Sequence, residues 1–354
     1  MSDLLYSEIE TDLRAGVREL LDDKAPWNDV LAGTERDEPL DAALWQSLTD
    51  MGVTALPVPE DRGGAGATWR ETAVVAEEIG RAVAPVPFLT GAVLGVAALL
   101  AADDRELLES GRAAVLAVPF TTDPHAAFAP TVRAGDGTLT GAVTSVADGA
   151  AADVLLVPAA DGLYAVEAAD AARTPVVSLD MTRRLCDVTF DGAPARRVAE
   201  GDAALRTALL TGAAILASEQ LGLAERCLES TVAYVKARYQ FGRPVGSYQA
   251  LKHRLADLWT SVTQARAVAR HAASCAATGD PDLPVAVAVA QAHCSAVAVK
   301  AAEECVQMHG GIGFTWEHPA HLYLKRAKSA ALALGAPDRH RAALATLVDL
   351  PPAP

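Results

Sequence analysis

Basic residues are scarce in this chain: 30 Lys and Arg stand against 45 Asp and Glu, a net charge of −15. Nonspecific nucleic-acid binding requires Lys and Arg to neutralise phosphates, so we expect no nucleic-acid partner. The sequence contains no uninterrupted apolar run of the ~18 residues that a membrane span needs. The N-terminal residues carry acids and lack a basic segment followed by an apolar run, so we expect no secretory signal.

Cysteine is also scarce. The five cysteines form no C-x-x-C pair and lie far apart in apolar stretches of the sequence. They are Cys186, Cys227, Cys275, Cys294 and Cys305. This pattern predicts buried free thiols and a reducing, cytoplasmic location. His318 and His321 have no Cys or acidic partner at ligand spacing, so we predict no metal site.

What the chain does have is apolar, globular composition, with 51% hydrophobic and 21% charged residues over 354 residues. This length suits two or three domains. Residues 1–113 show helical spacing, with Asp41 as a cap, a segment at 68–81 and an apolar helix at 91–102.

At residue 114 the residue pattern changes from helical spacing to short β-like runs. Short β-like runs, separated by Gly, Asp and Pro, continue to about residue 200 and predict an antiparallel β-barrel or sandwich. From residue 201 the chain reads as helix, with long amphipathic segments at 203–238, 248–277 and 284–308 that should pack as a bundle. We therefore predict an α+β fold with three domains: 1–113 helical, 114–200 β, and 201–354 a helical bundle.

Two segments of the C-terminal part combine polar side chains with a glycine turn. Residues 238–249 read RYQFGRPVGSYQ, where one helix ends and another begins, and residues 307–314 read QMHGGIGF, where a helix ends in glycines. An Arg together with free backbone N–H groups makes an anion site. The residues alone leave two readings open, a site for a phosphate-bearing cofactor and plain turn architecture.

At these segments the sequence resembles the acyl-CoA dehydrogenase family, which carries R-x-x-F-G-x-P-[LI]-x-x-x-Q and then Q-x-x-G-G-x-G-[FY]. The first motif is matched by Arg238, Phe241, Gly242, Pro244 and Gln249, and the second by Gln307, Gly310, Gly311, Gly313 and Phe314. The segment PEDRGGAG at 59–66, followed by EEIGR at 77–81, resembles the family's N-terminal pattern.

The resemblance implies an N-terminal helical domain, a middle β-barrel and a C-terminal four-helix bundle. It implies FAD at a dimer interface, in a homo- or heterotetramer, with an acyl-CoA (or acyl-carrier) thioester as substrate and an electron-transfer flavoprotein as electron acceptor. The cofactor-binding residues that it carries over hold the pyrophosphate and adenosine of FAD: Arg238, Phe241, Gln249, Gln307, Gly310 and Gly311.

The reaction that the resemblance implies is α,β-desaturation of the thioester. A carboxylate removes the α-proton while the β-hydride passes to flavin N5. At the family's usual base position this chain has Leu334, and at the alternative position on the first C-terminal helix it has Gly212. Neither can accept a proton. Asp338 and Glu219 are the remaining weak candidates, although each also reads as a surface or helix-cap acid.

The middle domain departs from the family as well. Residues 121–125 (TTDPH) and 143–146 (VTSV) stand where the family has T-E-P-x-x-G-S-D and W-I-[TS]-N. Three hypotheses follow: an active dehydrogenase with a displaced base, a base-less subunit of a heteromeric dehydrogenase, or a non-redox binding protein on the same fold. The Ala-rich helices would leave a wide pocket, which motivates a bulky, polyketide- or sterol-like acyl group as substrate.

Overall fold

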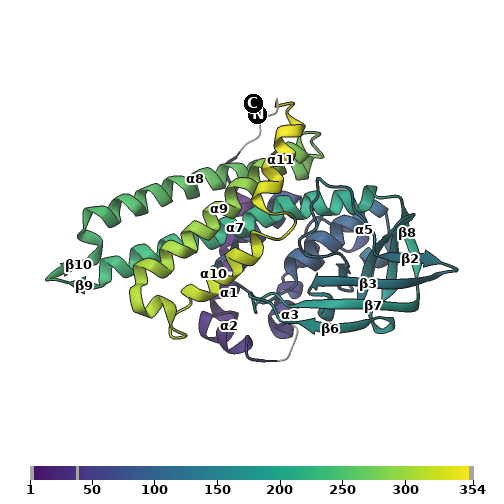
Figure 1. Ribbon diagram of the computed structural model, residues 1–354, viewed down its shortest axis with the longest axis horizontal. Helices are drawn as coiled ribbons and strands as arrows, with labels where there is room; N and C mark the ends of the chain where they lie inside the picture. Colours follow the sequence, from purple (N-terminus) through teal and green to yellow (C-terminus); the bar gives the residue numbers. More distant parts are fainter. Residues whose placement is uncertain (1–3, 37–39, 351–354) are drawn as a thin grey trace.

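The computed structural model describes residues 4–36 and 40–350. Helices occupy the chain up to Glu109, strands lie between Ala114 and Glu200, and helices follow from Ala203 (Figure 1). The α+β class and the order of helices, strands and helices are therefore as predicted. The division at 113/114 and 200/201 stays a prediction, which this order of elements supports.

Side-chain caps begin the N-terminal helices. Ser7 forms a capping box with Glu10, Thr68 forms one with Glu71, and Asp41 accepts the N–H of Leu44 at 2.9 Å, as its predicted capping role requires. The elements of this part are α1 (Glu8–Lys24), α2 (Trp27–Gly33), α3 (Ala42–Asp50), η1 (Val53–Ala55), η2 (Glu60–Arg62), α4 (Trp69–Ala82), η3 (Phe88–Gly95), α5 (Val96–Ala102) and α6 (Arg105–Glu109).

The predicted helix at 91–102 is present, begins earlier, at Phe88, and changes type along its length. Residues Phe88–Gly95 form a π-helix, and only Val96–Ala102 continue as α-helix. Gly95 explains part of this, because a Cβ there would lie 1.9 Å from the carbonyl oxygen of Ala114. The wider π-turn thus brings the backbone directly against the first strand, and such turns often mark functional positions.

The middle strands form two sheets rather than one closed antiparallel barrel. The sheet orders are β1-β4-β5-β8 and β2-β3-β7-β6, and β1 pairs with β4 in parallel. A parallel pair needs a crossover, and here the chain between β1 and β4 passes through β2 and β3 of the other sheet. The strands are β1 (Ala114–Leu116), β2 (Val132–Gly135), β3 (Thr138–Ala147), β4 (Val154–Ala159), β5 (Gly162–Glu167), β6 (Ala172–Val176), β7 (Leu185–Pro194) and β8 (Arg196–Glu200).

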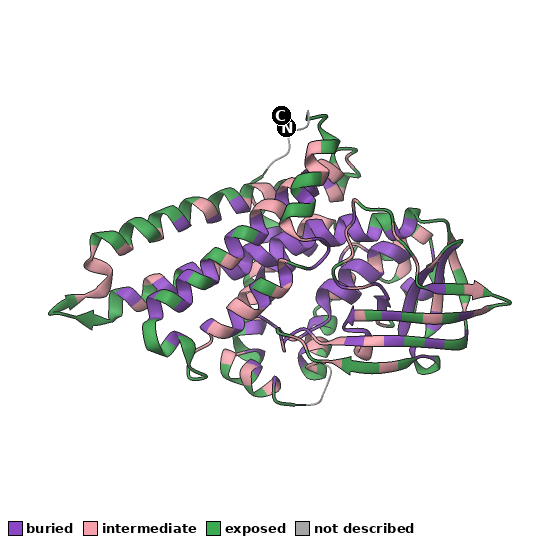
Figure 2. Cartoon of the chain, viewed as in Figure 1, coloured by how far each residue is buried: buried purple, intermediate pink, exposed green. Residues whose placement is uncertain are grey.

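The C-terminal part packs around α7 (Ala203–Ala237), the central helix of the molecule. Figure 2 shows it buried along most of its length, between the N-terminal helices and the long helices α8 (Gln249–Thr278) and α9 (Leu283–His309). The shorter helices α10 (Ala320–Ala330) and α11 (Pro337–Leu347) pack against α9. The predicted bundle is therefore present, with three long helices and two short ones.

Two of these helices are long and apolar enough to cross a membrane, although the sequence has no uninterrupted apolar run. They are Ala203–Ala237 and Leu283–Phe314, and 89% and 61% of their most apolar windows are buried within the fold. Burial of this extent is what core helices of a bundle show. The five cysteines are free and buried, as predicted.

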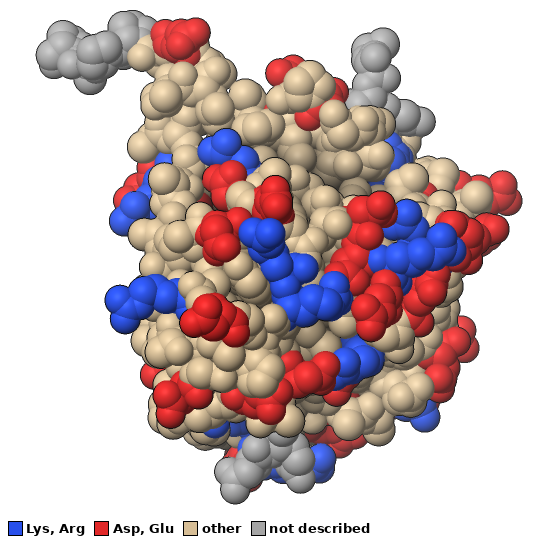
Figure 3. Space-filling view, turned by 90° about the vertical axis from the view of Figure 1, so that its right-hand side faces the viewer, with Lys and Arg blue, Asp and Glu red and all other residues tan. Residues whose placement is uncertain are grey.

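The surface carries charges of both signs. On the face at the strand end of the molecule, acidic and basic side chains are interspersed (Figure 3). Among residues 4–36 and 40–350, no group of three or more His, Cys, Asp and Glu side chains is arranged to hold a metal ion.

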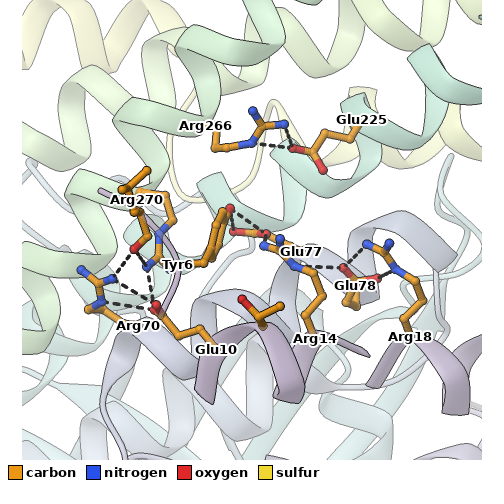
Figure 4. Close-up of polar contacts among 12 residues, drawn as sticks. Tyr6, Glu10, Arg14, Arg18, Arg70, Glu77, Glu78, Glu225, Arg266 and Arg270 are labelled. Carbon is orange, nitrogen blue, oxygen red and sulfur yellow. Dashed lines mark hydrogen bonds and ion pairs between the residues drawn. The ribbon is translucent and has the colours of Figure 1, made fainter. Parts of the chain in front are cut away.

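A buried ionic cluster fastens the N-terminal segment to the rest of the fold (Figure 4). The Tyr6 hydroxyl donates to both carboxylate oxygens of Glu77 on α4, at 3.0 and 3.1 Å. The Tyr6 ring lies between the guanidinium groups of Arg14 and Arg270, 3.9 and 4.3 Å from its centroid. Glu10 ion-pairs with Arg270 on α8 at 2.6 Å. These contacts tie α1, α4 and α8 together.

Glu77 should make the stability of the protein depend on pH. Burial raises the pKa of this carboxyl to about 7, against the opposing effect of Arg14. Because the folded pKa lies above the unfolded value, the stabilisation is complete below about pH 4.5 and is lost as the pH rises towards 7. As the pH rises from about 4.5 to about 7, the wild type should lose about 3 kcal/mol of its free energy of unfolding through this group, whereas Glu77→Gln should not. Urea unfolding of both proteins over this pH range measures the difference. A parallel pH profile for the two proteins would contradict this assignment.

Candidate active site

Arg238 and Phe241 lie at one end of the bundle, where α7 ends. The hairpin β9 (Tyr239–Gln240) and β10 (Arg243–Pro244) turns through Phe241 and Gly242, whose φ angles are +52° and +77°. This geometry is that of a two-residue hairpin turn, in which the second position favours Gly. Phe241 is 92% exposed, and among the described residues none hydrogen-bonds or ion-pairs with the Arg238 guanidinium.

Gln307, Gly310 and Gly311 lie at the same end of the bundle, where α9 ends (Figure 1). Gly310 has φ +64° and ψ −139°, a backbone conformation essentially confined to glycine, and it opens the short helix η7 (Gly310–Phe314). The rings of Tyr234 and His309 stack at 4.3 Å, so the ends of α7 and α9 are in direct contact. The two predicted segments are thus neighbours.

Gln249 adds a helix N-terminus to this group. It is the first residue of α8, it is exposed, and it follows the 3₁₀ turn η6 (Val245–Ser247). The exposed end of the bundle therefore presents an Arg guanidinium, a glycine turn and the positive end of a long helix. These groups fit a diphosphate, and because they face outward they can serve a cofactor held jointly with another subunit.

The two family base positions meet inside the molecule. A Cβ on Gly212 would lie 2.3 Å from Leu94 Cδ2 and 3.3 Å from Leu334 Cδ1, so α7, the π-helix η3 and the segment between α10 and α11 converge here. Leu334 is fully buried and has a positive φ of +51°. Its N–H donates to the Phe120 carbonyl at 2.8 Å, which links it to the β domain. This point, which we call the base locus, contains aliphatic side chains and a glycine.

Glu219, one of the weak base candidates, is buried and ion-paired. Its carboxylate accepts from Arg183 at 2.7 and 2.8 Å and from Arg326 at 2.9 Å. Burial raises its pKa, but the two guanidinium groups outweigh this effect and the net pKa is lowered. A carboxylate bound in this way is a poor proton acceptor, and we interpret Glu219 as a structural counter-ion.

Asp338, the other weak candidate, lies in the first turn of α11 and is exposed. An acid at this position stabilises a helix N-terminus by a few tenths of a kcal/mol up to about 1 kcal/mol. We therefore expect Asp338→Asn to lower stability by less than about 1 kcal/mol and to leave turnover unchanged. Steady-state kinetics would check this, and loss of turnover with intact flavin content would return Asp338 to the role of base.

Several residues around the base locus carried no signal in the sequence. Arg326 ion-pairs with Asp180 at 2.7 Å, Thr90 of η3 donates to Asp148 at 2.8 Å, and the Arg183 guanidinium lies 5.2 Å from the Phe120 ring. Burial raises the pKa of Asp148 to about 6, which Arg183 opposes. The pair Arg183-Arg184 in otherwise β-like text is the one sequence feature that could have drawn attention to this cluster.

The departing segment 121–125 lies beside the base locus. A Cβ on Gly335 would lie 3.5 Å from Asp123 Cγ and 3.0 Å from His340 Nε2. His340 Nε2 is 2.9 Å from the Leu334 carbonyl, and its ring meets His125 at 5.3 Å. Segment 143–146 also comes near, because the Ser145 carbonyl accepts the N–H of Phe120 at 3.0 Å. Both segments therefore lie close to the base locus.

Comparison with known proteins identifies the family of this chain. Residues 7–104 match the family model "Acyl-CoA dehydrogenase, N-terminal domain", and residues 199–348 match "Acyl-CoA dehydrogenase, C-terminal domain". The acyl-CoA dehydrogenase IpdE2 of Mycolicibacterium smegmatis is 37% identical over 332 residues, which cover 94% of this chain and 96% of that protein.

Two solved structures share the whole fold. The ChsE4-ChsE5 complex from Mycobacterium tuberculosis has a TM-score of 0.88 at 28% identity, covering 99% of this chain and 100% of that chain. A variant of the Tcur3481-Tcur3483 steroid ACAD has a TM-score of 0.88 at 30% identity, covering 97% and 98%. The chain therefore belongs to the acyl-CoA dehydrogenase family, whose members are FAD-dependent oxidoreductases acting on CH–CH bonds.

Proposed function

We propose that this acyl-CoA dehydrogenase works together with a second, homologous subunit that supplies the catalytic carboxylate. The observation that carries this proposal is the base locus, where both family base positions converge and hold Leu334 and Gly212. Neither side chain can accept the α-proton. The reaction still needs a base within hydrogen-bond reach, so that base must come from another residue or another chain.

The buried acids around the base locus support a base from outside the chain. Glu219 and Asp180 are bound to Arg326, and Asp148 accepts from Thr90. Asp123 is half-buried and accepts the N–H of His125 at 2.8 Å. Taking Glu219 away from its ion pairs would leave the buried Arg183 guanidinium with no other ion pair among the described residues, which is costly. If the lone chain is active, Asp123 is the acid best placed to act as its catalytic base. The variant Asp123→Asn is therefore part of the test.

The cofactor residues are proposed to act at the shared interface. Arg238 and the turn at Gly310–Gly311 would hold the diphosphate of FAD, with Gln249, Gln307 and Phe241 around the adenosine. Bound FAD supplies the hydride acceptor for the β-carbon. The free Arg238 guanidinium and the outward orientation of the whole group are the features that fit this role. The existence of solved two-component relatives is consistent with it.

The substrate is proposed to be a bulky, steroid-like acyl-CoA thioester. Two features motivate this choice: the similarity to a steroid ACAD at 30% identity, and the many alanines in the helices around the base locus. We further propose an electron-transfer flavoprotein as electron acceptor and a cytoplasmic location. A substrate panel in which short linear chains are turned over faster than steroid-like ones would contradict the substrate proposal.

The experiment compares the lone chain with the same chain co-expressed with a homologous chain that has Glu at the position matching Leu334. Absorbance between about 350 and 500 nm gives flavin per subunit, and turnover is followed with a steroid-like acyl-CoA. We expect little flavin and no turnover from the lone chain, and both from the complex. Stoichiometric flavin with turnover from the lone chain would contradict the proposal, and loss of that turnover in Asp123→Asn would identify its base.

A further inference from the structure

A buried histidine lies directly next to the glycine turn. His309 is the last residue of α9, directly before Gly310, and its side chain is 3% exposed. Its ring lies between the Tyr234 ring at 4.3 Å and the His318 ring at 4.2 Å. Nδ1 is 2.7 Å from the Cys305 carbonyl, a distance at which Nδ1–H donates a hydrogen bond. The imidazole is thus fixed by three neighbours.

The glycine turn folds around this imidazole-bearing residue. A Cβ on Gly313 would lie 3.2 Å from the Cβ of His309 and 2.6 Å from the Val306 carbonyl oxygen, so the turn closes back on the last turn of α9. Gly310 holds a conformation that other residues rarely adopt. The turn is therefore packed against the last turn of α9, directly beside His309.

The groups that face His309 favour its protonated form. On its own helix, the Cys305 thiol lies 3.6 Å from Nδ1. On α7, the Tyr234 ring covers one face of His309, and Cys227 is close enough to Cys305 to shift the pKa of that thiol. From the segment after η7, His318 covers the other face, and its Nδ1 accepts the N–H of Ala320 at 3.2 Å, as the neutral tautomer does.

The pKa shifts agree with this picture. Burial lowers the pKa of His309, but its hydrogen bonds with Cys305 outweigh burial and the net pKa is raised. The pKa of Cys305 is lowered, chiefly by Cys227 on α7, while burial lowers the pKa of His318. Cys305 and the C-terminus of α9 therefore both favour the cationic form of His309.

We propose that His309 is a positioning residue for the diphosphate of the cofactor: it holds the Gly310–Gly311 turn in place and, when protonated, adds a positive charge beside it. This inference rests on the proposed function in one respect, that the turn binds FAD. The diphosphate of FAD is a diester and keeps its charge between about pH 6 and pH 8.5. The affinity for FAD must therefore fall as His309 loses its proton on raising the pH.

The test measures the dissociation constant of FAD by flavin fluorescence at about pH 6 and about pH 8.5, in the assembly that binds flavin. For the wild type we expect the affinity to fall about three- to tenfold across this range, the effect of one partly screened charge. In His309→Gln the affinity should be low and independent of pH. In Cys305→Ser the transition should move to lower pH, because serine supports the imidazolium less well.

The controls separate this inference from the proposed function. His293→Gln, on α9 but away from the turn, should keep the wild-type pH profile, and thermal unfolding checks that each variant folds. A wild-type profile in His309→Gln would overturn the role of His309 while leaving flavin binding intact. If His309→Gln does not fold, Cys305→Ser provides the test. A pH dependence of FAD affinity in Cys305→Ser that is unchanged from the wild type would overturn the proposed role of His309. Failure of every assembly to bind FAD would refute the proposed function itself.

Discussion

Replacing Glu219 by alanine is expected to destabilise the protein by about 3–5 kcal/mol, because it leaves two buried guanidinium groups without their shared carboxylate. Arg183 and Arg326 are both almost fully buried, and Glu219 accepts from each. Arg326 would keep Asp180 at 2.7 Å, whereas Arg183 would keep no other ion pair among the described residues. Urea unfolding of the wild type and the variant measures the difference.

Glu225 provides a matched control on the same helix. It ion-pairs with Arg266 at 2.6 Å, but Arg266 is partly exposed. Water can solvate that guanidinium once the partner is removed, so Glu225→Ala should cost less than about 1 kcal/mol. Equal losses in the two variants would show that burial does not decide the effect and would contradict the structural role of Glu219.

The same carboxylate should make the protein sensitive to acid. The folded pKa of Glu219 lies below its ordinary value, so its contribution is present at neutral pH and is lost as the pH falls through that lowered pKa. Its protonation would also leave Arg183 without its ion pair, so the free energy of unfolding should fall in this acid range, which urea unfolding at several pH values would measure.

The second large effect is expected from Arg238→Ala, which should weaken FAD binding about 10- to 100-fold. Charge-assisted hydrogen bonds to a phosphate contribute about 1.5–3 kcal/mol, and Arg238 has no partner among the described residues that would compete for it. Stability should change little, since the side chain is exposed. Flavin retained after gel filtration and the fluorescence-derived dissociation constant measure the loss.

Arg243 in the same hairpin is the control for this prediction. Its guanidinium lies 3.8 Å from the centroid of the Tyr248 ring, so part of its interaction energy is internal to the chain. Arg243→Ala should change FAD affinity less than Arg238→Ala, and Arg238→Lys should recover part of the affinity because a charge remains. Unaltered flavin content in Arg238→Ala would show that this Arg does not contact the cofactor.

Local sequence signals identified the family and the two C-terminal motifs that we propose to bind the cofactor. Arg238, Phe241, Gln307 and Gly310 lie in contiguous motifs whose spacing can be read directly, and short-range backbone geometry, such as the turn at Phe241–Gly242, follows from residue type. The buried cysteines and the long helices were also predictable, because each depends on apolar periodicity within a single segment.

The strand pairing was less predictable. Strands β2, β6 and β8 carry mixed or exposed residues and gave little β signal, and the parallel pairing of β1 with β4 depends on residues some forty positions apart. The π-helical form of η3 was not predicted for a similar reason, since it depends on the close contact of Gly95 with Ala114.

By itself the sequence determined the order of helices and strands, the acyl-CoA dehydrogenase family and the absence of a carboxylate at positions 334 and 212. Only the tertiary structure decided that Leu334, Gly212 and Leu94 meet at one point. It also decided that Glu219 is neutralised by Arg183 and Arg326, which are 36 and 107 residues away along the chain. The reason is physical: helix and turn propensities act between near neighbours, whereas the pairing of buried charges depends on which distant segments pack together.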